Sequence, residues 1–151
     1  MPSRNVSAST TIDAPPAAVF AILADPRQHQ RIDGSGTVQG TVSGPERLTL
    51  GAEFGMDMKL GTSYKIKNTV VEFEEDRLIA WRHVGAHRWR YELTPTPGGG
   101  TEVTETWDLG RYPLPLRLVI STLFTAKTRK AVPETLAKLK QAAEADASVT
   151  G

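Results

Sequence analysis

The chain has 151 residues, of which 39% are hydrophobic and 23% charged, with a formal net charge of +1 and no cysteine. This length and composition predict one soluble globular domain over residues 1–151, and they exclude a disulfide scaffold, a cysteine nucleophile and a thiolate zinc site. Basic residues are spread along the chain and not clustered, so the sequence does not favour a nucleic-acid partner.

The chain also lacks the apolar segments that membranes and export require. No apolar run approaches the ~20 residues of a membrane span. The first ten residues lack the apolar core of a signal peptide. We therefore expect a cytoplasmic protein with no stable membrane insertion.

The N-terminal part of the chain predicts a strand followed by two short helices. Residues 6–12 alternate weakly and are rich in Ser and Thr, as in an edge strand. The proline pair at 15–16 suits the first turn of a helix, where a missing N–H has no partner to lose. Apolar residues then recur at helical spacing up to Ala24, and Pro26 can begin a second short helix that continues to about Ile32.

Strands and turns follow, after a flexible loop over residues 33–36. We predict strands over 37–42, 52–60 and 63–74, because polar and apolar residues alternate there. The alternation slips at the pair Val70 and Val71, which indicates a β-bulge.

Three more strands, over 78–84, 87–96 and 101–109, are joined by short turns and are therefore expected to pair antiparallel. The glycine run at 98–100 lies in one of these turns; no helix follows it, so it is not a phosphate-binding loop. Symmetric hairpins would place three residue pairs opposite one another on a single apolar face. These pairs are Trp81 with Trp89, Trp89 with Trp107, and Tyr91 with Glu105.

After Pro115 the pattern becomes helical. A first apolar stripe contains Leu116, Val119, Ile120, Leu123 and Phe124, and Val132, Leu136, Leu139 and Ala143 continue it. Pro133 is expected to kink or restart this helix. The basic residues Lys127, Arg129 and Lys130 form either a membrane-surface patch or, more simply, a solvated helix face.

This order of elements resembles the SRPBCC superfamily, which includes START lipid-transfer domains and polyketide cyclase/dehydrase-like proteins. The resemblance rests on the segments 12–16, 19–20 and 25–26, on 70–73 and 78–81, and on 89–93 and 100–105. It implies an α+β helix-grip fold, in which a curved antiparallel sheet of six or seven strands wraps around a long C-terminal helix. The segment 29–32 lacks the tryptophan that many relatives carry, which implies a different cavity entrance.

Glu105 is the first candidate for chemistry, because it is the only carboxylate on the predicted apolar face of its hairpin. Burial would raise the pKa of its carboxyl, and such a group can donate a proton or anchor a polar ligand atom. The alternative is that a bulge turns Glu105 outward, or that it lies at a wet rim beside an arginine.

The histidines His83 and His87 flank a turn and can face the same side. Two histidines there could bind a metal, but no third ligand stands at a fixed spacing, so exposure beside the turn is the simpler interpretation. Asn68 reaches His83 if the strands over 63–74 and 78–84 pair antiparallel. We predict neither a metal nor a cofactor.

The sequence thus leaves three functional hypotheses open. The first is binding of a small hydrophobic molecule, such as a lipid or a polyketide, between the sheet and the last helix. The second is a polyketide cyclase or dehydratase that uses Glu105 or His83 as acid or base. The third is a dimeric interaction module. Across these hypotheses, we expect either a monomer or a homodimer. The predicted lining, which core packing alone could also explain, comprises Phe54, Met56, Met58, Asn68, Trp81, Trp89, Tyr91, Trp107, Ile120, Phe124 and Leu136.

Overall fold

One antiparallel sheet and one long helix make up most of the molecule. The computed structural model describes residues 6–33, 38–60, 62–82, 87–109 and 114–150. The seven strands lie in the order β1-β7-β6-β5-β4-β3-β2. Their bounds are β1 Val6–Ile12, β2 Val38–Ser43, β3 Glu53–Leu60, β4 Thr62–Glu74, β5 Leu78–Arg82, β6 Arg88–Pro95 and β7 Thr101–Asp108. The helices are α1 Pro16–Leu23, the 3-10 turn η1 Pro26–Gln28, α2 His29–Ile32 and α3 Leu114–Thr150.

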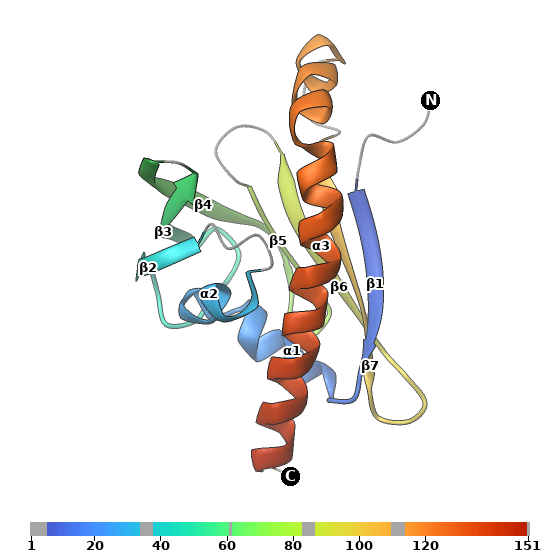
Figure 1. The fold of residues 1–151 in the computed structure, drawn as a ribbon. Helices are drawn as coiled ribbons and strands as arrows, with labels where there is room; N and C mark the ends of the chain where they lie inside the picture. The colour runs from blue at the N-terminus through green and yellow to red at the C-terminus, as the bar shows by residue number, and fades with distance from the viewer. Residues whose placement is uncertain (1–5, 34–37, 61, 83–86, 110–113, 151) are drawn as a thin grey trace.

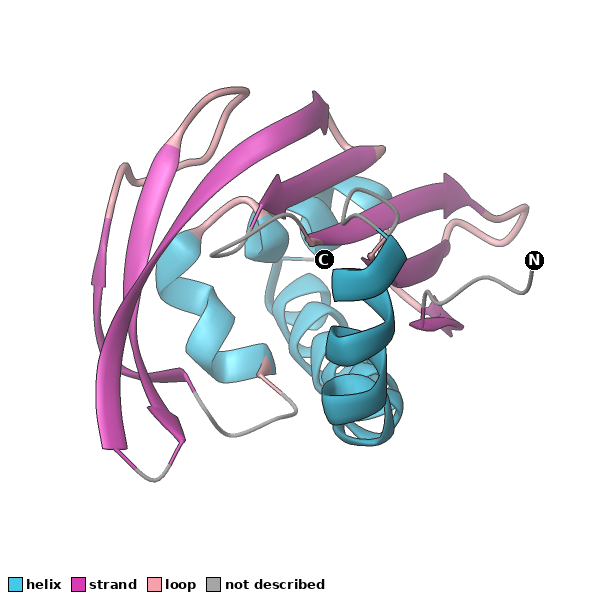
Figure 2. Cartoon of the chain, turned by 90° about the horizontal axis from the view of Figure 1, so that it is seen from above, coloured by secondary structure: helices cyan, strands magenta, loops and turns pink. Residues whose placement is uncertain are grey.

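The sheet curves around the helices. Figure 1 shows α3 running along the face of the sheet beside β1, with α1 and α2 next to it. Figure 2, seen from above, shows the sheet as an arc with the helices on its concave side. Helix α3 packs against β1 and β7 at one end of the strand order and against α1 and α2. This is the helix-grip α+β fold that the sequence predicts.

The predicted strand register is confirmed. Trp81 pairs with Trp89, Trp89 with Trp107, and Tyr91 with Glu105. The expected bulge also appears, as a shift in the β4–β5 register between Val70 and Glu72. No shift interrupts the β6–β7 pairing, so the alternation of side chains is continuous along both strands and Glu105 faces inward.

The segment between β1 and β2 folds as its prolines indicate. Pro15 precedes α1 in an extended conformation and Pro16 occupies its first turn, where the fixed φ of proline fits a helix. The Asp25 carboxylate accepts a hydrogen bond from the Arg27 backbone N–H and so caps η1. Helix α2 follows η1 directly, and its His29 ring lies against Phe54 and Trp81 of the sheet.

Helix α3 bears on two of the sequence-based expectations. Its helical conformation continues through Pro133, which excludes a restart, one of the two outcomes expected at this proline. The first apolar stripe is not buried along its whole length, because Leu116 and Val119 are 46% and 53% exposed. Among the described side chains of α3, the buried apolar ones lie further along the helix and comprise Val132, Leu136, Leu139, Ala142 and Ala143.

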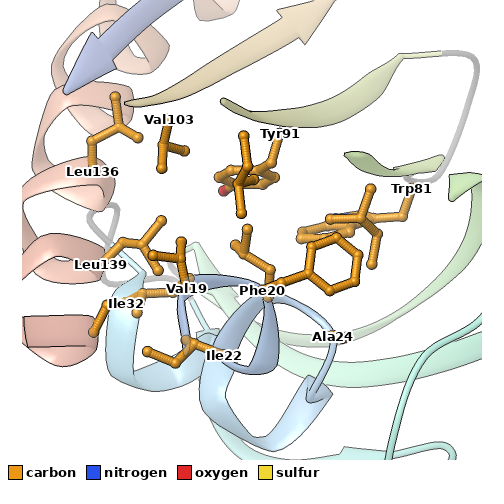
Figure 3. Close-up of a cluster of buried hydrophobic side chains, with 14 of the residues drawn as sticks. Val19, Phe20, Ile22, Ala24, Ile32, Trp81, Tyr91, Val103, Leu136 and Leu139 are labelled. Carbon is orange, nitrogen blue, oxygen red and sulfur yellow. The ribbon is translucent and has the colours of Figure 1, made fainter. Parts of the chain in front are cut away.

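A single apolar cluster joins α1, α2, α3 and the inner face of the sheet. Figure 3 shows Val19 and Phe20 of α1 below Tyr91 and Trp81 of the sheet, with Leu136 and Leu139 of α3 closing one side. The core therefore consists of one sheet face covered by three helices.

Among the described helices, none is both long and apolar enough to cross a membrane.

Candidate functional site

A chain of aromatic rings runs across the inner face of the sheet. The His29 ring of α2 stacks on Trp81 of β5, with centroids 4.7 Å apart and planes 19° apart. The Trp81 ring lies 5.4 Å from that of Tyr91 on β6, and Phe54 meets both His29 and Trp81 edge-on. All four side chains are buried and in contact. We call this group, His29, Phe54, Trp81 and Tyr91, the aromatic wall.

Glu105 stands at one end of this wall and is 1% exposed. The Tyr91 hydroxyl donates a hydrogen bond of 3.0 Å to Glu105 Oε2, while no described residue partners Oε1. Burial is the main cause that raises the pKa of this carboxyl from 4.5 to about 8, against the lowering effect of the Tyr91 hydrogen bond. The Asp33 carboxylate raises it further, so Glu105 is protonated at neutral pH.

His29 stands at the other end of the aromatic wall and is 5% exposed. Its Nε2 lies 2.8 Å from the backbone oxygen of Leu23, which can only accept, so Nε2 carries the hydrogen. Burial lowers the pKa of His29 below its ordinary 6.5, which leaves the ring neutral at pH 7. Nδ1 is therefore an acceptor, and it too has no partner among the described residues.

A second aromatic group lies toward the other end of β6 and β7. The Trp89 and Trp107 rings are 6.2 Å apart, and His87 approaches Trp107 edge-on at 6.0 Å. Trp107 is buried whereas Trp89 is half-buried. Partial burial lowers the pKa of His87 to about 4, so this imidazole is neutral as well.

The structure places most of the predicted lining residues on the inner face. Phe54, Trp81 and Tyr91 belong to the aromatic wall with Glu105 beside them, and Asn68 is buried on β4 at 1% exposure. Leu136 joins the same apolar cluster from α3. Several predicted residues lie outside the part of the chain whose side chains the structure describes: Met56, Met58, His83, Ile120 and Phe124.

The described residues contain no cluster of three or more His, Asp or Glu side chains that could hold a metal ion. His83, one of the two histidines considered for such a site, is outside this part of the chain. The chemistry that the described site offers is that of neutral hydrogen-bonding groups set among aromatic rings.

Two residues at this site were not predicted from the sequence, namely His29 and Asp33. His29 lies three residues before the buried Ile32, a spacing that places both on one helical face. That spacing could have indicated an inward histidine. The influence of Asp33 on Glu105, Tyr91 and His29 depends on how α2 docks, and no local pattern encodes it.

The chain is similar in sequence to a known family and to curated proteins. Residues 3–144 match the family described as polyketide cyclase / dehydrase and lipid transport. A curated relative, the uncharacterized protein Rv0088 of Mycobacterium tuberculosis, is 40% identical over 138 residues. That match covers 89% of this chain but 62% of the relative, so the chain spans less than two thirds of its length.

Solved structures give the same fold at low sequence identity. The protein NE0264 from Nitrosomonas europaea has a TM-score of 0.70 at 15% identity, covering 98% of this chain and 99% of that one. The KanY protein has a TM-score of 0.69 at 18% identity, covering 95% and 99%. These likenesses concern the fold, and with the family match they confirm the SRPBCC resemblance. The chain belongs to the polyketide cyclase / dehydrase and lipid transport family.

Proposed function

We propose that this protein binds a small, largely apolar molecule against the aromatic wall, with Tyr91 and Glu105 orienting a polar atom of that molecule. The observation that carries the proposal is the Glu105 carboxyl, which is buried among apolar groups and has an oxygen, Oε1, without a partner among the described residues. Leaving a buried polar group unpaired costs about 1–3 kcal/mol, and native proteins rarely do so without a role for the group.

The surroundings of Glu105 support a mainly apolar occupant. The aromatic wall presents Trp81, Tyr91 and Phe54, and Val103 lies on the same strand two positions away from Glu105. Flat rings with one or two placed polar groups are typical of small-molecule sites. The family description, which names both polyketide chemistry and lipid transport, agrees with this type of ligand.

Calorimetric titration of acetylnaphthalene tests the proposal, because this probe combines a flat apolar body with one hydrogen-bond acceptor. We expect measurable binding to the wild type and about tenfold weaker binding to Glu105→Leu, the loss of one hydrogen bond of ordinary strength. Glu105→Gln should recover part of the loss, since its amide can still donate.

Glu102→Gln is the matched control, because Glu102 lies on the same strand β7 but is exposed on the opposite face. This variant should bind as the wild type does. Equal binding to Glu105→Leu and wild type would contradict the role of Glu105, and absence of any binding would contradict the proposal as a whole.

An enzymatic role is the second candidate, and the pKa of Glu105 near 8 favours it. A carboxylic acid that keeps its proton at neutral pH can act as a general acid in a cyclisation or dehydration. In that case Glu105→Gln would abolish turnover of a poly-β-keto thioester while the substrate still binds. Equal turnover by Glu105→Gln and wild type would remove Glu105 from such a mechanism.

A further inference from the structure

Two buried polar atoms face the inner side of the fold without a partner among the described residues, Oε1 of Glu105 and Nδ1 of His29. They belong to different elements, β7 and α2. The rings of Trp81 and Tyr91 lie between them, since His29 stacks on Trp81 and Tyr91 donates to Glu105. Each atom alone could be accommodated by a trapped water. Their shared position at the two ends of one aromatic surface suggests a common partner instead.

The two atoms have opposite hydrogen-bonding character. Because His29 Nε2 donates to the Leu23 oxygen, Nδ1 of the neutral ring can only accept. Because Tyr91 donates to Glu105 Oε2, a proton on this carboxyl resides on Oε1, which then donates. No cation pairs with Glu105 among the described residues, and Asp33 adds negative charge nearby, so both conditions favour the protonated acid.

The sheet determines how far apart Glu105 and Trp81, the residue on which His29 stacks, are held. Glu105, Tyr91 and Trp81 lie on three successive strands, β7, β6 and β5. Glu105 pairs with Tyr91, whereas Trp81 pairs with Trp89, so Trp81 lies two strands and two residues away from Glu105. With about 4.8 Å between strands and about 3.3 Å per residue, the two positions are roughly 12 Å apart, and the His29 ring is stacked on Trp81. One or two fused rings with a polar atom at each end match this distance.

We propose that the molecule bound at this site is uncharged and flat, and that it carries a hydroxyl-type donor for His29 Nδ1 at one end and a carbonyl-type acceptor for Glu105 Oε1 at the other. This inference rests on the proposed function, since it names the class of molecule that the same site selects. It assigns His29 as a residue that determines specificity. It also disfavours fatty acids and other carboxylates, because a carboxylate placed against Glu105 and near Asp33 would find no compensating positive charge among the described side chains of the aromatic wall.

Four naphthalene derivatives test the ligand class at about pH 6.5, where a naphthol hydroxyl remains neutral. They are acetylnaphthalene, naphthol, an acetylnaphthol with its two groups at opposite ends of the ring system, and the corresponding hydroxynaphthoate. We expect acetylnaphthol to bind about tenfold more tightly than either singly substituted compound, because each correct group adds one hydrogen bond. The hydroxynaphthoate should bind at least tenfold more weakly than acetylnaphthol.

His29→Gln tests the contact between His29 Nδ1 and the hydroxyl donor of the bound molecule. The glutamine amide can replace Nε2 as donor to Leu23, but it presents no acceptor at the position of Nδ1. The measured quantity is the ratio of the affinities for acetylnaphthol and acetylnaphthalene. We expect this ratio to fall from about ten in the wild type to about one in His29→Gln. In Glu102→Gln the ratio should stay at the wild-type value.

The outcomes separate this inference from the proposed function. If all four compounds bind equally well, or if the ratio is the same in His29→Gln and wild type, a trapped water satisfies Nδ1 and the inference is wrong, while apolar binding stands. Tightest binding by the hydroxynaphthoate would also overturn it. If none of the compounds binds, the proposed function fails together with the inference.

Discussion

At the scale of single residues, Glu105 is an ionisable side chain in surroundings that favour apolar ones. Every other buried residue of β7 in the described structure is apolar or, like Thr101, uncharged; Glu105 alone can ionise. A local rule that is broken without an evident structural gain often marks a functional position. The Tyr91 hydroxyl donates to one of its oxygens, and the other has no partner within the part of the chain that the structure describes.

The raised pKa of Glu105 predicts a pH dependence of stability. Unfolding returns the pKa of this carboxyl from about 8 to 4.5, so between these values the folded state binds one more proton than the unfolded state. Stability therefore falls as the pH rises through this range, by about 1.4 kcal/mol per pH unit, and the contribution is lost above the folded pKa. His29 and His87, with pKa values lowered from 6.5, have the opposite effect on stability, and they act mainly below about pH 7.5.

Urea denaturation between pH 6.5 and pH 8 measures this effect, and comparison with Glu105→Gln separates it from the histidines. We expect the free energy of unfolding of the wild type to decrease by about 1–2 kcal/mol across this window. In Glu105→Gln, which cannot ionise, the decrease should disappear, whereas Glu102→Gln should keep it. A flat wild-type profile would mean that Glu105 is already ionised in the folded protein.

The sequence predicts the position of Glu105 but not that of His29. Short turns fix the pairing of β5, β6 and β7, and strict alternation then determines which side chains face inward. His29 lies on a helix of four residues, whose orientation is set by packing against Trp81 and Phe54. Contacts between distant segments of this kind leave little trace in local residue patterns.

At the scale of elements, the docking of α3 combines polar and apolar contacts. Arg31 of α2 forms a two-pronged ion pair with Asp146, at 2.8 and 2.9 Å, and Lys140 donates to the Thr11 backbone oxygen. The Arg31 and Asp146 side chains remain 40% and 45% exposed, so solvent screens their attraction. Leu139, in contrast, is fully buried in the apolar cluster.

We therefore expect apolar burial to dominate the attachment of α3. Leu139→Ala should lower the free energy of unfolding by about 2–5 kcal/mol, because it removes buried methyl groups and leaves a cavity. A double-mutant cycle on Arg31 and Asp146 should give a coupling below about 1 kcal/mol. Chemical denaturation of the four proteins of the cycle and of Leu139→Ala measures both. A coupling larger than the Leu139→Ala effect would reverse this ranking.

The same helix shows where sequence periodicity stops being informative. The stripe that begins at Leu116 has helical spacing, yet Leu116 and Val119 are exposed, whereas Leu136 and Leu139 are buried. Periodicity identifies residues that share a helical face. Whether that face meets a partner depends on where the sheet and the short helices end, and α3 packs against β1, β7, α1 and α2.

At the scale of the whole molecule, the sheet forms an arc with the helices on its concave side (Figure 2). Strand order places Trp81, Tyr91 and Glu105 on adjacent strands, and α2 adds His29 above Trp81. The resemblance of the chain to its family predicts this architecture. The family match does not specify the molecule that is bound, which depends on the side chains at the site.

The central claim is that a small, mainly apolar molecule binds at the aromatic wall. Backbone amide chemical shifts recorded by NMR during a titration with acetylnaphthol test this claim most directly. We expect the largest changes on α2 and on the strands β5, β6 and β7, around His29, Trp81, Tyr91 and Glu105. Changes confined to the exposed start of α3, around Leu116 and Val119, or no changes at all, would contradict it.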